Sequence, residues 1–298
     1  MELLRAPVLL IANLAARRAP GLLTAAERAF RAAGVRCDVV LTERPGHGAE
    51  VAARLAGFYG AVFTLGGDGT AVEVVGALAH SGVPVGVLPG GTGNLVARSL
   101  RIPLRVEGAV AQLLAGDIAA VDLGVLDNGR HFAFSAGVGV DARMIAETSP
   151  RVKQRFGVAA YAYTAARVTL RRRPFRVRAE VDGEHVERTA AAVMLANFGT
   201  VLSRLMVLGP GIRSDDGVLD LCVFSPARTG DAFRVTWRLL RKDFGSDDAL
   251  LYRSGHQFRI ECNPPQLYQA DGEVLGTTPF SARVEPLAAR LLVPASHD

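Results

Sequence analysis

The chain up to residue 115 alternates continuous apolar runs with helix-forming segments. A continuous apolar run is typical of a strand that is buried on both faces of a sheet. Such a run predicts a strand at 7–12, and further strands are predicted at 35–42, 61–65 and 83–88. The segments between and after them predict helices at 24–33, 48–56, 72–81, 95–100 and 106–115. This βαβα rhythm predicts an α/β domain with a mostly parallel sheet and helices on both faces.

The pattern changes near residue 122. Short runs rich in Val, Phe and Leu, separated by Gly, Asp, Asn and Pro, are typical of antiparallel strands. They predict strands at 122–126, 131–138, 175–182, 190–196, 218–224 and 256–262, with helices at 156–171 and 229–242. We therefore expect two domains, an α/β domain at 1–125 and a β-rich, antiparallel, sandwich-like domain at 126–285. The tail, 286–298, is expected to return to the first domain.

The composition is that of a globular protein. Of 298 residues, 49% are hydrophobic and 21% are charged, which excludes a disordered chain. The mean hydropathy of +0.22 is high, but no apolar run approaches the roughly 20 residues of a spanning helix. The start of the chain lacks the features of a signal peptide. Cys37, Cys222 and Cys262 show neither disulfide nor zinc spacing. These features favour the cytoplasm.

The net charge of +5 is unevenly distributed. Nine Lys and Arg residues lie between Arg151 and Arg178 without an intervening Asp or Glu, and Phe156, Tyr161 and Tyr163 lie among them. Such a segment can contact anionic lipid headgroups or nucleic acid. No aromatic-interleaved nucleic-acid motif accompanies it, so we expect no nucleic-acid partner. A membrane-facing surface and a solvated arginine-rich helix both remain open.

A glycine-rich motif, Leu-Gly-Gly-Asp-Gly-Thr at 65–70, follows the third predicted strand and precedes a helix. Glycines let backbone N–H groups turn toward a bound anion, and the positive end of the helix favours phosphate. A carboxylate in such a loop would repel phosphate unless a metal or a transferable proton were involved. Asp68 is therefore a candidate magnesium contact or general base. The alternative is a tight turn in which Asp68 caps the helix.

A second motif, Leu-Pro-Gly-Gly-Thr-Gly-Asn at 88–94, follows the next predicted strand. Loops at the carboxyl ends of successive parallel strands converge on one crevice, so two such loops indicate a ligand site far more strongly than one. Thr92 and Asn94 could hydrogen-bond phosphate or ribose. Neither a P-loop nor a dinucleotide-binding fingerprint occurs in the required context.

Together with Glu73, these two loops resemble the diacylglycerol kinase and sphingosine kinase superfamily, especially its bacterial lipid-kinase branch. Further similar elements follow in family order along nearly the whole chain. They are Asn13, the segment Thr42 to His47, the segments 134–141 and 214–220, and Asp271-Gly272-Glu273.

The resemblance implies which residues would act. Asp68 would lie between nucleotide, metal and substrate hydroxyl, and either Glu273 or Asp271 would accept the proton. The carbonyls of Arg213 and Val218, with the carboxylate of Asp216, would hold Mg²⁺, which prefers hard oxygen donors. The implied ATP-binding residues are Asn13, Thr42, Gly66, Gly67, Asp68, Gly69, Thr70, Ala71, Val72, Thr92, Gly93 and Asn94.

The implied function is an ATP- and Mg²⁺-dependent lipid kinase that phosphorylates a hydroxyl of a diacylglycerol-like lipid or a long-chain base. Residues 1–125 would form the nucleotide-binding catalytic domain, and 126–285 the lipid-binding domain. We expect a cytoplasmic protein that contacts an anionic membrane surface reversibly. A homodimer is left open.

Two departures from the family pattern matter. Residues 13–17 lack the Pro and Gly that the family usually has there, and Leu95 replaces a common Asp. Asp122 is either part of the acidic network or a turn residue, and Asp215 either caps a turn or binds metal. The alternatives are an NAD kinase-like enzyme and a binding protein without turnover. The first motif is shared with NAD kinases, whereas the second favours lipid kinases.

Overall fold

The computed structural model divides the chain into two compact units. The first comprises Met1–Val121 and Leu287–Asp298, and the second comprises Asp122–Pro286. The described residues are 7–14, 19–91, 93–139, 174–198, 200–201, 206–207, 209, 211–225, 231, 234, 238, 241, 243 and 247–295. The predicted helix at 156–171, most of that at 229–242, and the basic residues from 151 to 173 lie outside this part.

The first unit contains a parallel sheet in the order β2-β1-β3-β4. These strands are β1 (Val8–Ala12), β2 (Cys37–Leu41), β3 (Ala61–Gly66) and β4 (Val85–Pro89). Every residue of β1 and β4 is buried, as continuous apolar runs require. The final part of β18 (Phe280–Val293) adds a further parallel neighbour, with Leu291 opposite Val85. The predicted mostly parallel sheet is confirmed.

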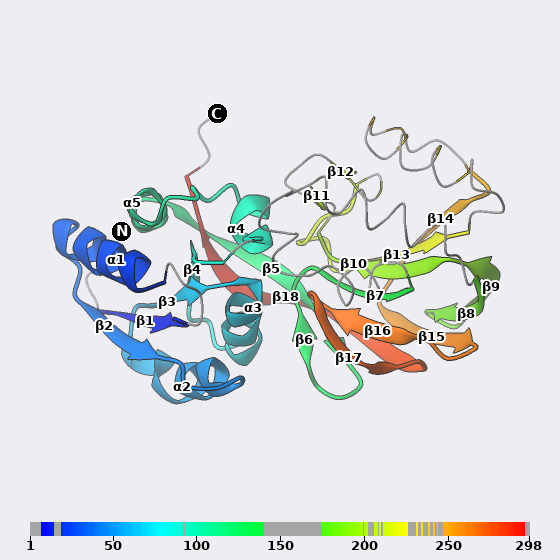
Figure 1. Cartoon of the computed structure of the whole chain (residues 1–298), viewed down its shortest axis with the longest axis horizontal. Helices are drawn as coiled ribbons and strands as arrows, with labels where there is room; N and C mark the ends of the chain where they lie inside the picture. The colour runs from blue at the N-terminus through cyan, green and yellow to red at the C-terminus, as the bar shows by residue number, and fades with distance from the viewer. Residues whose placement is uncertain are drawn as a thin grey trace. The chain divides into compact units, whose positions relative to one another are not determined.

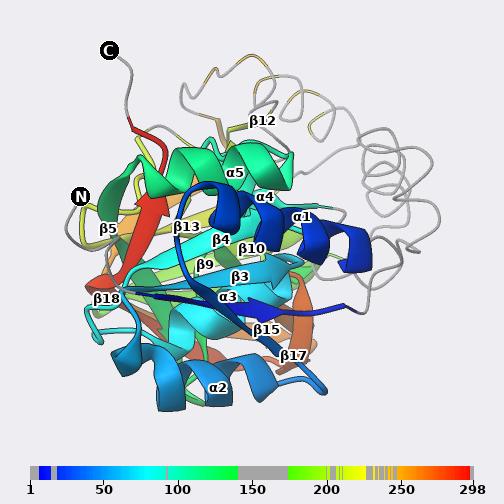
Figure 2. The same cartoon turned by 90° about the vertical axis from the view of Figure 1, so that its left-hand side faces the viewer.

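Helices cover both faces of this sheet (Figures 1 and 2). They are α1 (Ala19–Ala32), α2 (His47–Leu55) with a 3-10 turn (Ala56–Phe58), α3 (Asp68–Ala77), α4 (Leu95–Ser99) and α5 (Val106–Leu114). Helix α1 contacts α5, and α2 contacts α3. An edge-to-face contact between Phe30 and Phe63, with ring centroids 4.9 Å apart, attaches α1 to β3. Helix α3 begins at Asp68 rather than at residue 72, because the glycine motif itself forms the first helical turn.

The second unit contains two antiparallel sheets. The first has the order β14-β13-β10-β7-β16-β17, with β14 (Leu250–Gly255), β13 (Leu219–Phe224), β10 (Ala192–Ala196), β7 (Ser135–Gly139), β16 (Leu267–Ala270) and β17 (Glu273–Thr277). The second continues from β18 through β15 (Gln257–Asn263) and β8 (Phe175–Val181) to β9 (Glu184–Ala190). Strand β5 (Asp117–Leu126) pairs with β18 and with β6 (His131–Phe132), and β11 (Thr200–Val201) pairs with β12 (Met206–Val207).

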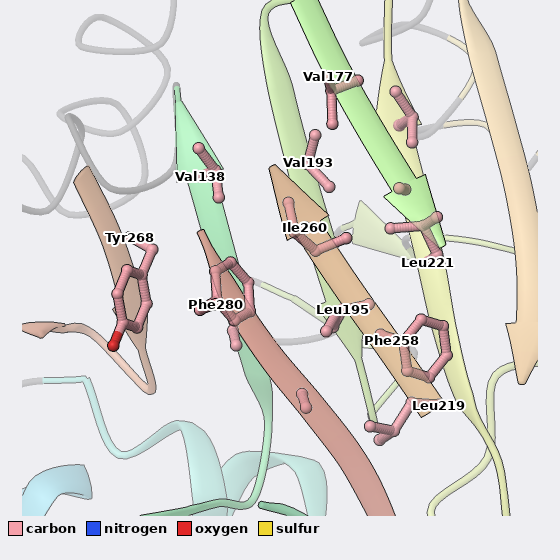
Figure 3. Close-up of a cluster of buried hydrophobic side chains, with 14 of the residues drawn as sticks. Val138, Val177, Val193, Leu195, Leu219, Leu221, Phe258, Ile260, Tyr268 and Phe280 are labelled. Atoms are coloured by element: carbon pink, nitrogen blue, oxygen red, sulfur yellow. The ribbon is translucent and has the colours of Figure 1, made fainter. Parts of the chain in front are cut away.

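The core of the second unit is formed by the inward-facing side chains of these two sheets (Figure 3). Val193, Leu195 and Leu221 come from the first sheet, and Phe258 and Ile260 from the second. All five are almost fully buried. This alternation of buried and outward positions is the pattern of a β-sandwich, and it confirms the predicted β-rich, antiparallel domain.

Several strands were not predicted from the sequence. Strand β9, Glu184–Ala190, carries charged and mostly exposed side chains, so it has no hydrophobic signal. The expected single strand at 131–138 is two strands, β6 and β7, which pair with different partners. Strand β18 passes through Pro286, and no strand was predicted over its range.

Candidate active site

The two glycine motifs lie against each other in the first unit, at the carboxyl ends of β3 and β4. The backbone N–H of Gly90 donates a hydrogen bond to the carbonyl of Gly66 at 2.9 Å. A Cβ on Gly90 would lie 2.9 Å from the Gly66 nitrogen, and one on Gly91 would lie 2.7 Å from the Cα of Gly67. Only residues without a side chain allow the two backbones this approach, so the glycines bring the two loops together at one edge of the sheet.

Asp68 connects this loop pair to the following helix. It is the first residue of α3, whose N-cap is Gly67. Its Oδ1 accepts a hydrogen bond from the backbone N–H of Val96 at 3.0 Å, at the start of α4. A Cβ on Gly93 would lie 3.0 Å from the other carboxylate oxygen. Asp68 therefore does not cap its own helix but binds the N-terminal turn of α4.

The pKa of Asp68 reflects two opposing effects. Burial raises the pKa of the half-buried carboxyl group, whereas the backbone N–H groups of Val96, Leu95 and Asn94 lower it. Burial is the larger effect, so the pKa lies above its ordinary value. A raised pKa makes a carboxylate a better proton acceptor, as a general base requires. Leu95, which replaces the common Asp, still contributes through its backbone.

The side chain of Asn94 closes the second glycine loop. Asn94 has a left-handed backbone conformation, with φ of 50°. Its Oδ1 accepts the N–H of Gly91 at 2.9 Å, and its Nδ2 donates to the Gly91 carbonyl at 2.9 Å. The amide is thus used within the loop, and its role is to hold the loop's shape. Thr92 lies outside the described residues, while Gly93 is exposed.

Three further predicted residues meet at the same edge of the sheet. The Nδ2 of Asn13 donates to Thr70 Oγ1 at 3.3 Å, and its backbone N–H donates to the Leu65 carbonyl at 2.8 Å. The N–H of Thr42 donates to the Ala12 carbonyl at 2.9 Å. Asn13, Thr42 and Thr70 therefore follow β1, β2 and β3 at their carboxyl ends. Gly69 is exposed beside them, whereas Ala71 and Val72 are buried within α3.

Glu73 and His47 organise the segment before α2. Glu73 Oε1 accepts the backbone N–H of Ala49 at 3.0 Å, in the first turn of α2. The N-cap residue of this helix, Gly46, has no side chain that could accept an N–H group, so Glu73 supplies the acceptor. His47 Nδ1 accepts the N–H of Glu43 at 3.1 Å. In the neutral imidazole the proton is therefore on Nε2. Both side chains hold this loop in place beside Thr42.

In the second unit, Asp271 and Glu273 lie two residues apart but have different surroundings. Asp271 and Gly272 form a two-residue turn between β16 and β17, with φ of 47° and 90°. The Asp271 carboxylate accepts N–H groups from Ala133, Phe134 and Ser135 at 2.6, 2.8 and 3.0 Å. Glu273 is exposed and pairs with Arg130. Three backbone N–H groups thus occupy the Asp271 carboxylate, whereas the Glu273 carboxylate is exposed and contacts a single side chain, that of Arg130, in the described part of the chain.

The predicted magnesium loop, residues 213–218, is held by Asp122. The buried carboxylate of Asp122 accepts the N–H of Gly217 at 2.8 Å, and its own N–H donates to the Ser214 carbonyl at 2.6 Å. Asp215 faces the Arg213 guanidinium at 3.0 Å, which lowers the pKa of Asp215. Asp122 therefore anchors the loop instead of ending a strand, and Asp215 is engaged in an ion pair.

These contacts leave a donor set that fits a magnesium ion. Asp216 Oδ1 accepts a long hydrogen bond of 3.4 Å from the Val218 N–H. Its carboxylate and the carbonyls of Arg213 and Val218 are hard oxygen donors within one short loop. Among the described residues, no group of three or more His, Cys, Asp or Glu side chains could hold a metal. A magnesium site in this loop would therefore depend on backbone carbonyls.

Sequence reasoning missed two residues of this framework. The Nδ2 of Asn197, buried after β10, donates to the carbonyls of Asp122 and Ala133 at 2.7 and 2.8 Å. It thereby joins the strand that holds the magnesium loop to the segment that holds Asp271. Arg130 pairs with Glu273. Neither residue lies in a recognisable motif, because each acts through a contact distant in the sequence.

Two family profiles together cover most of the chain. Residues 7–126 match the diacylglycerol kinase catalytic domain, and residues 133–293 match the YegS C-terminal NAD kinase beta sandwich-like domain. The chain belongs to the diacylglycerol kinase family. The catalytic domain of this kinase is therefore of the diacylglycerol kinase type, and its β-rich domain is similar to the β-sandwich of NAD kinases.

Similar proteins include a named kinase and a solved structure of the same fold. The kinase is 27% identical over 221 residues to a diacylglycerol kinase of Bacillus subtilis, covering 73% of this chain and 72% of that protein. It is 30% identical to an uncharacterized protein of Synechocystis over 80% of this chain, but this covers only 55% of that longer protein. A diacylglycerol kinase structure from Bacillus anthracis has a TM-score of 0.75 at 21% identity, covering 96% of each chain.

In the part of the chain that is described, no helix has the length and apolar character needed to cross a bilayer.

Proposed function

We propose that this kinase transfers the γ-phosphoryl group of ATP, with Mg²⁺, to a hydroxyl group of a diacylglycerol-like lipid or a long-chain base. The observation that carries the proposal is the position of Asp68. Its carboxylate has a raised pKa and binds the Val96 N–H beside the two paired glycine loops. The catalytic-domain match and the named relatives support the same reaction class.

In the proposed reaction, the lipid hydroxyl oxygen attacks the γ-phosphorus, the bond to the bridging oxygen breaks, and ADP leaves. The backbone N–H groups in the first turn of α3, which begins at Asp68, would position the phosphates. A bound Mg²⁺ would neutralise the charge that develops on the phosphoryl oxygens. The hydroxyl proton passes to a carboxylate, for which Asp68 and Glu273 are the two candidates. Asp271 is a weaker candidate, because three N–H groups already occupy its oxygens.

A substrate panel tests the proposal and its rivals. ATP consumption would be measured with diacylglycerol, ceramide, long-chain bases and NAD, with and without Mg²⁺. The proposed function expects Mg²⁺-dependent turnover with one of the lipids. Turnover with NAD alone would instead identify an NAD kinase-like enzyme. Nucleotide or lipid binding without turnover of any acceptor would identify a non-catalytic binding protein.

Reversible contact with an anionic membrane is a further part of the proposal, because a lipid acceptor stays in a bilayer. Its support is the basic segment from Arg151 to Arg178. At the described end of this segment, Arg176 and Arg178 both face Glu187 on β9 at 3.6 Å. The contact would therefore come from residues up to 173. Each Lys or Arg near an anionic surface contributes roughly 1 kcal/mol.

Vesicle co-sedimentation tests this contact. The wild type should bind anionic vesicles at low salt and release them at high salt. The triple variant Arg171→Glu/Arg172→Glu/Arg173→Glu should bind more weakly. Equal binding to neutral and anionic vesicles, or unchanged binding of the variant, would rule the contact out. Sedimentation of the protein alone would decide whether it forms a homodimer.

A further inference from the structure

We propose that Arg130 is a positioning residue for the carboxylate of Glu273, an inference that rests on the proposed function and refines it. Nη2 of Arg130 donates a hydrogen bond to Oε2 of Glu273, across 143 residues of sequence. Both residues belong to the unit Asp122–Pro286. The ion pair therefore connects the turn between β5 and β6 to the first residue of β17.

The backbone that carries Glu273 is already fixed, so only its side chain is free to vary. Within the turn, the N–H of Asp271 donates to the Ser135 carbonyl at 2.9 Å, and that of Gly272 donates to Gln269 Oε1 at 2.7 Å. The side chain of Glu273 is 61% exposed. An exposed glutamate without a partner samples several rotamers. Its pairing with Arg130 selects among them.

The backbone that carries Arg130 is fixed as well. The N–H of Leu126 donates to the Arg130 carbonyl at 2.9 Å, and the N–H of Arg130 donates to Asn128 Oδ1 at 3.0 Å. Gly129 allows this closed turn with a φ of 80°. The guanidinium is planar with N–H donors in fixed directions, so it orients a carboxylate more strictly than an ammonium does.

The two turns are also connected through Asp271. Residues 133–135, which follow Arg130 in the chain, donate their N–H groups to Asp271 next to Glu273. One segment, 130–135, thus binds Asp271 in the turn and also the carboxylate of Glu273. Exposed ion pairs contribute little to folding stability. The Arg130–Glu273 pair is accordingly expected to matter for the orientation of the carboxylate and not for the fold.

Steady-state kinetics of Arg130→Ala test this inference. We expect kcat to fall on the order of tenfold, because a loosely held catalytic group spends less time in the productive geometry. The KM values for ATP and lipid, and Tm, should stay close to those of the wild type. Arg130→Lys should recover part of kcat, since it keeps the charge. Arg259→Ala is the matched control, since Arg259 forms an exposed ion pair with Glu261 on β15 at 3.0 Å.

Glu273→Gln separates this inference from the proposed function. If Glu273 is the proton acceptor, Glu273→Gln is slow, and adding Arg130→Ala slows it no further, because the two residues act as a unit. A slow Glu273→Gln with wild-type kcat in Arg130→Ala overturns the positioning role alone. Wild-type kcat in Glu273→Gln removes Glu273 from catalysis. If Arg130→Ala does not fold, Arg130→Gln is measured against the same criteria.

Discussion

The carboxylate of Asp68 accepts a hydrogen bond from the backbone N–H of Val96 at 3.0 Å, across 28 residues of sequence. This contact joins the first glycine loop to the helix that follows the second one. It explains how Asp68 can be held in a fixed orientation while one carboxylate oxygen faces Gly93. The orientation of this carboxylate therefore depends on both loops together.

Asp68→Asn should lower kcat by a factor on the order of 10²–10⁴, because it removes a base or metal contact. The amide oxygen of Asn can still accept the Val96 N–H, so the fold should be kept. Steady-state kinetics and circular dichroism of the purified variant check this. A folded variant with a near wild-type rate would remove Asp68 from catalysis.

The same variant should also change stability with pH in a defined direction. The pKa of Asp68 is raised above its ordinary value of 3.8 in the folded state. The wild type therefore loses stability from this group as the pH rises through the folded pKa, whereas the amide side chain of the variant has no charge to bury. The Tm of Asp68→Asn minus that of the wild type should therefore increase as the pH rises from below 3.8 to neutral. Thermal melts without Mg²⁺ and nucleotide measure this difference. A difference that decreases toward neutral pH would contradict the assigned cause.

Gly90→Ala should destabilise the protein by about 1–3 kcal/mol, because its Cβ would meet the backbone of Gly66. Gly69→Ala is the control, since a Cβ there meets nothing within 4 Å and Gly69 has no positive φ. In the first turn of α3, alanine should be as stable as glycine or slightly more so. Urea denaturation compares the two. If Gly69→Ala costs as much as Gly90→Ala, close loop packing is not the cause.

Asp216→Ala should abolish the rise in Tm that added Mg²⁺ gives the wild type, because backbone carbonyls alone hold the ion poorly. Asp215→Ala is the matched control, because Asp215 is engaged by the Arg213 side chain. It should keep the magnesium response. Thermal melts over a Mg²⁺ titration decide between them, and an unchanged response in Asp216→Ala excludes this residue from the site.

Asp271→Asn should destabilise the second unit by about 1–3 kcal/mol. In the variant, the amide –NH₂ would face a backbone N–H group that the carboxylate accepts in the wild type, and this donor would lose its acceptor. Glu273→Gln should leave stability nearly unchanged and lower kcat. Urea denaturation and kinetics of the two variants, side by side, test this division of roles. The opposite result, a stable Asp271→Asn and an unfolded Glu273→Gln, would reverse it.

The sequence predicts the first unit better than the second for a physical reason. Continuous apolar runs such as Val8–Ala12 identify buried parallel strands directly. In the second unit, β9 is exposed and charged, so its pairing with β8 leaves no hydrophobic pattern. The motifs likewise locate Asp68 and Glu273, but not their partners. Val96 acts through its backbone, and Arg130 acts across 143 residues, so neither leaves a local pattern.

The last strand of the chain affects the order in which the protein can be completed during synthesis. Residues 287–293 of β18 belong to the same unit as residues 1–121, and Leu291 pairs with Val85 of β4. A ribosome produces the chain from its N-terminus, so one edge of β4 has no strand beside it until the whole second unit has been made. Exposed strand edges are prone to pair with other chains. The nascent kinase must protect this edge throughout the synthesis of the second unit, and the sheet that carries its glycine loops is completed last.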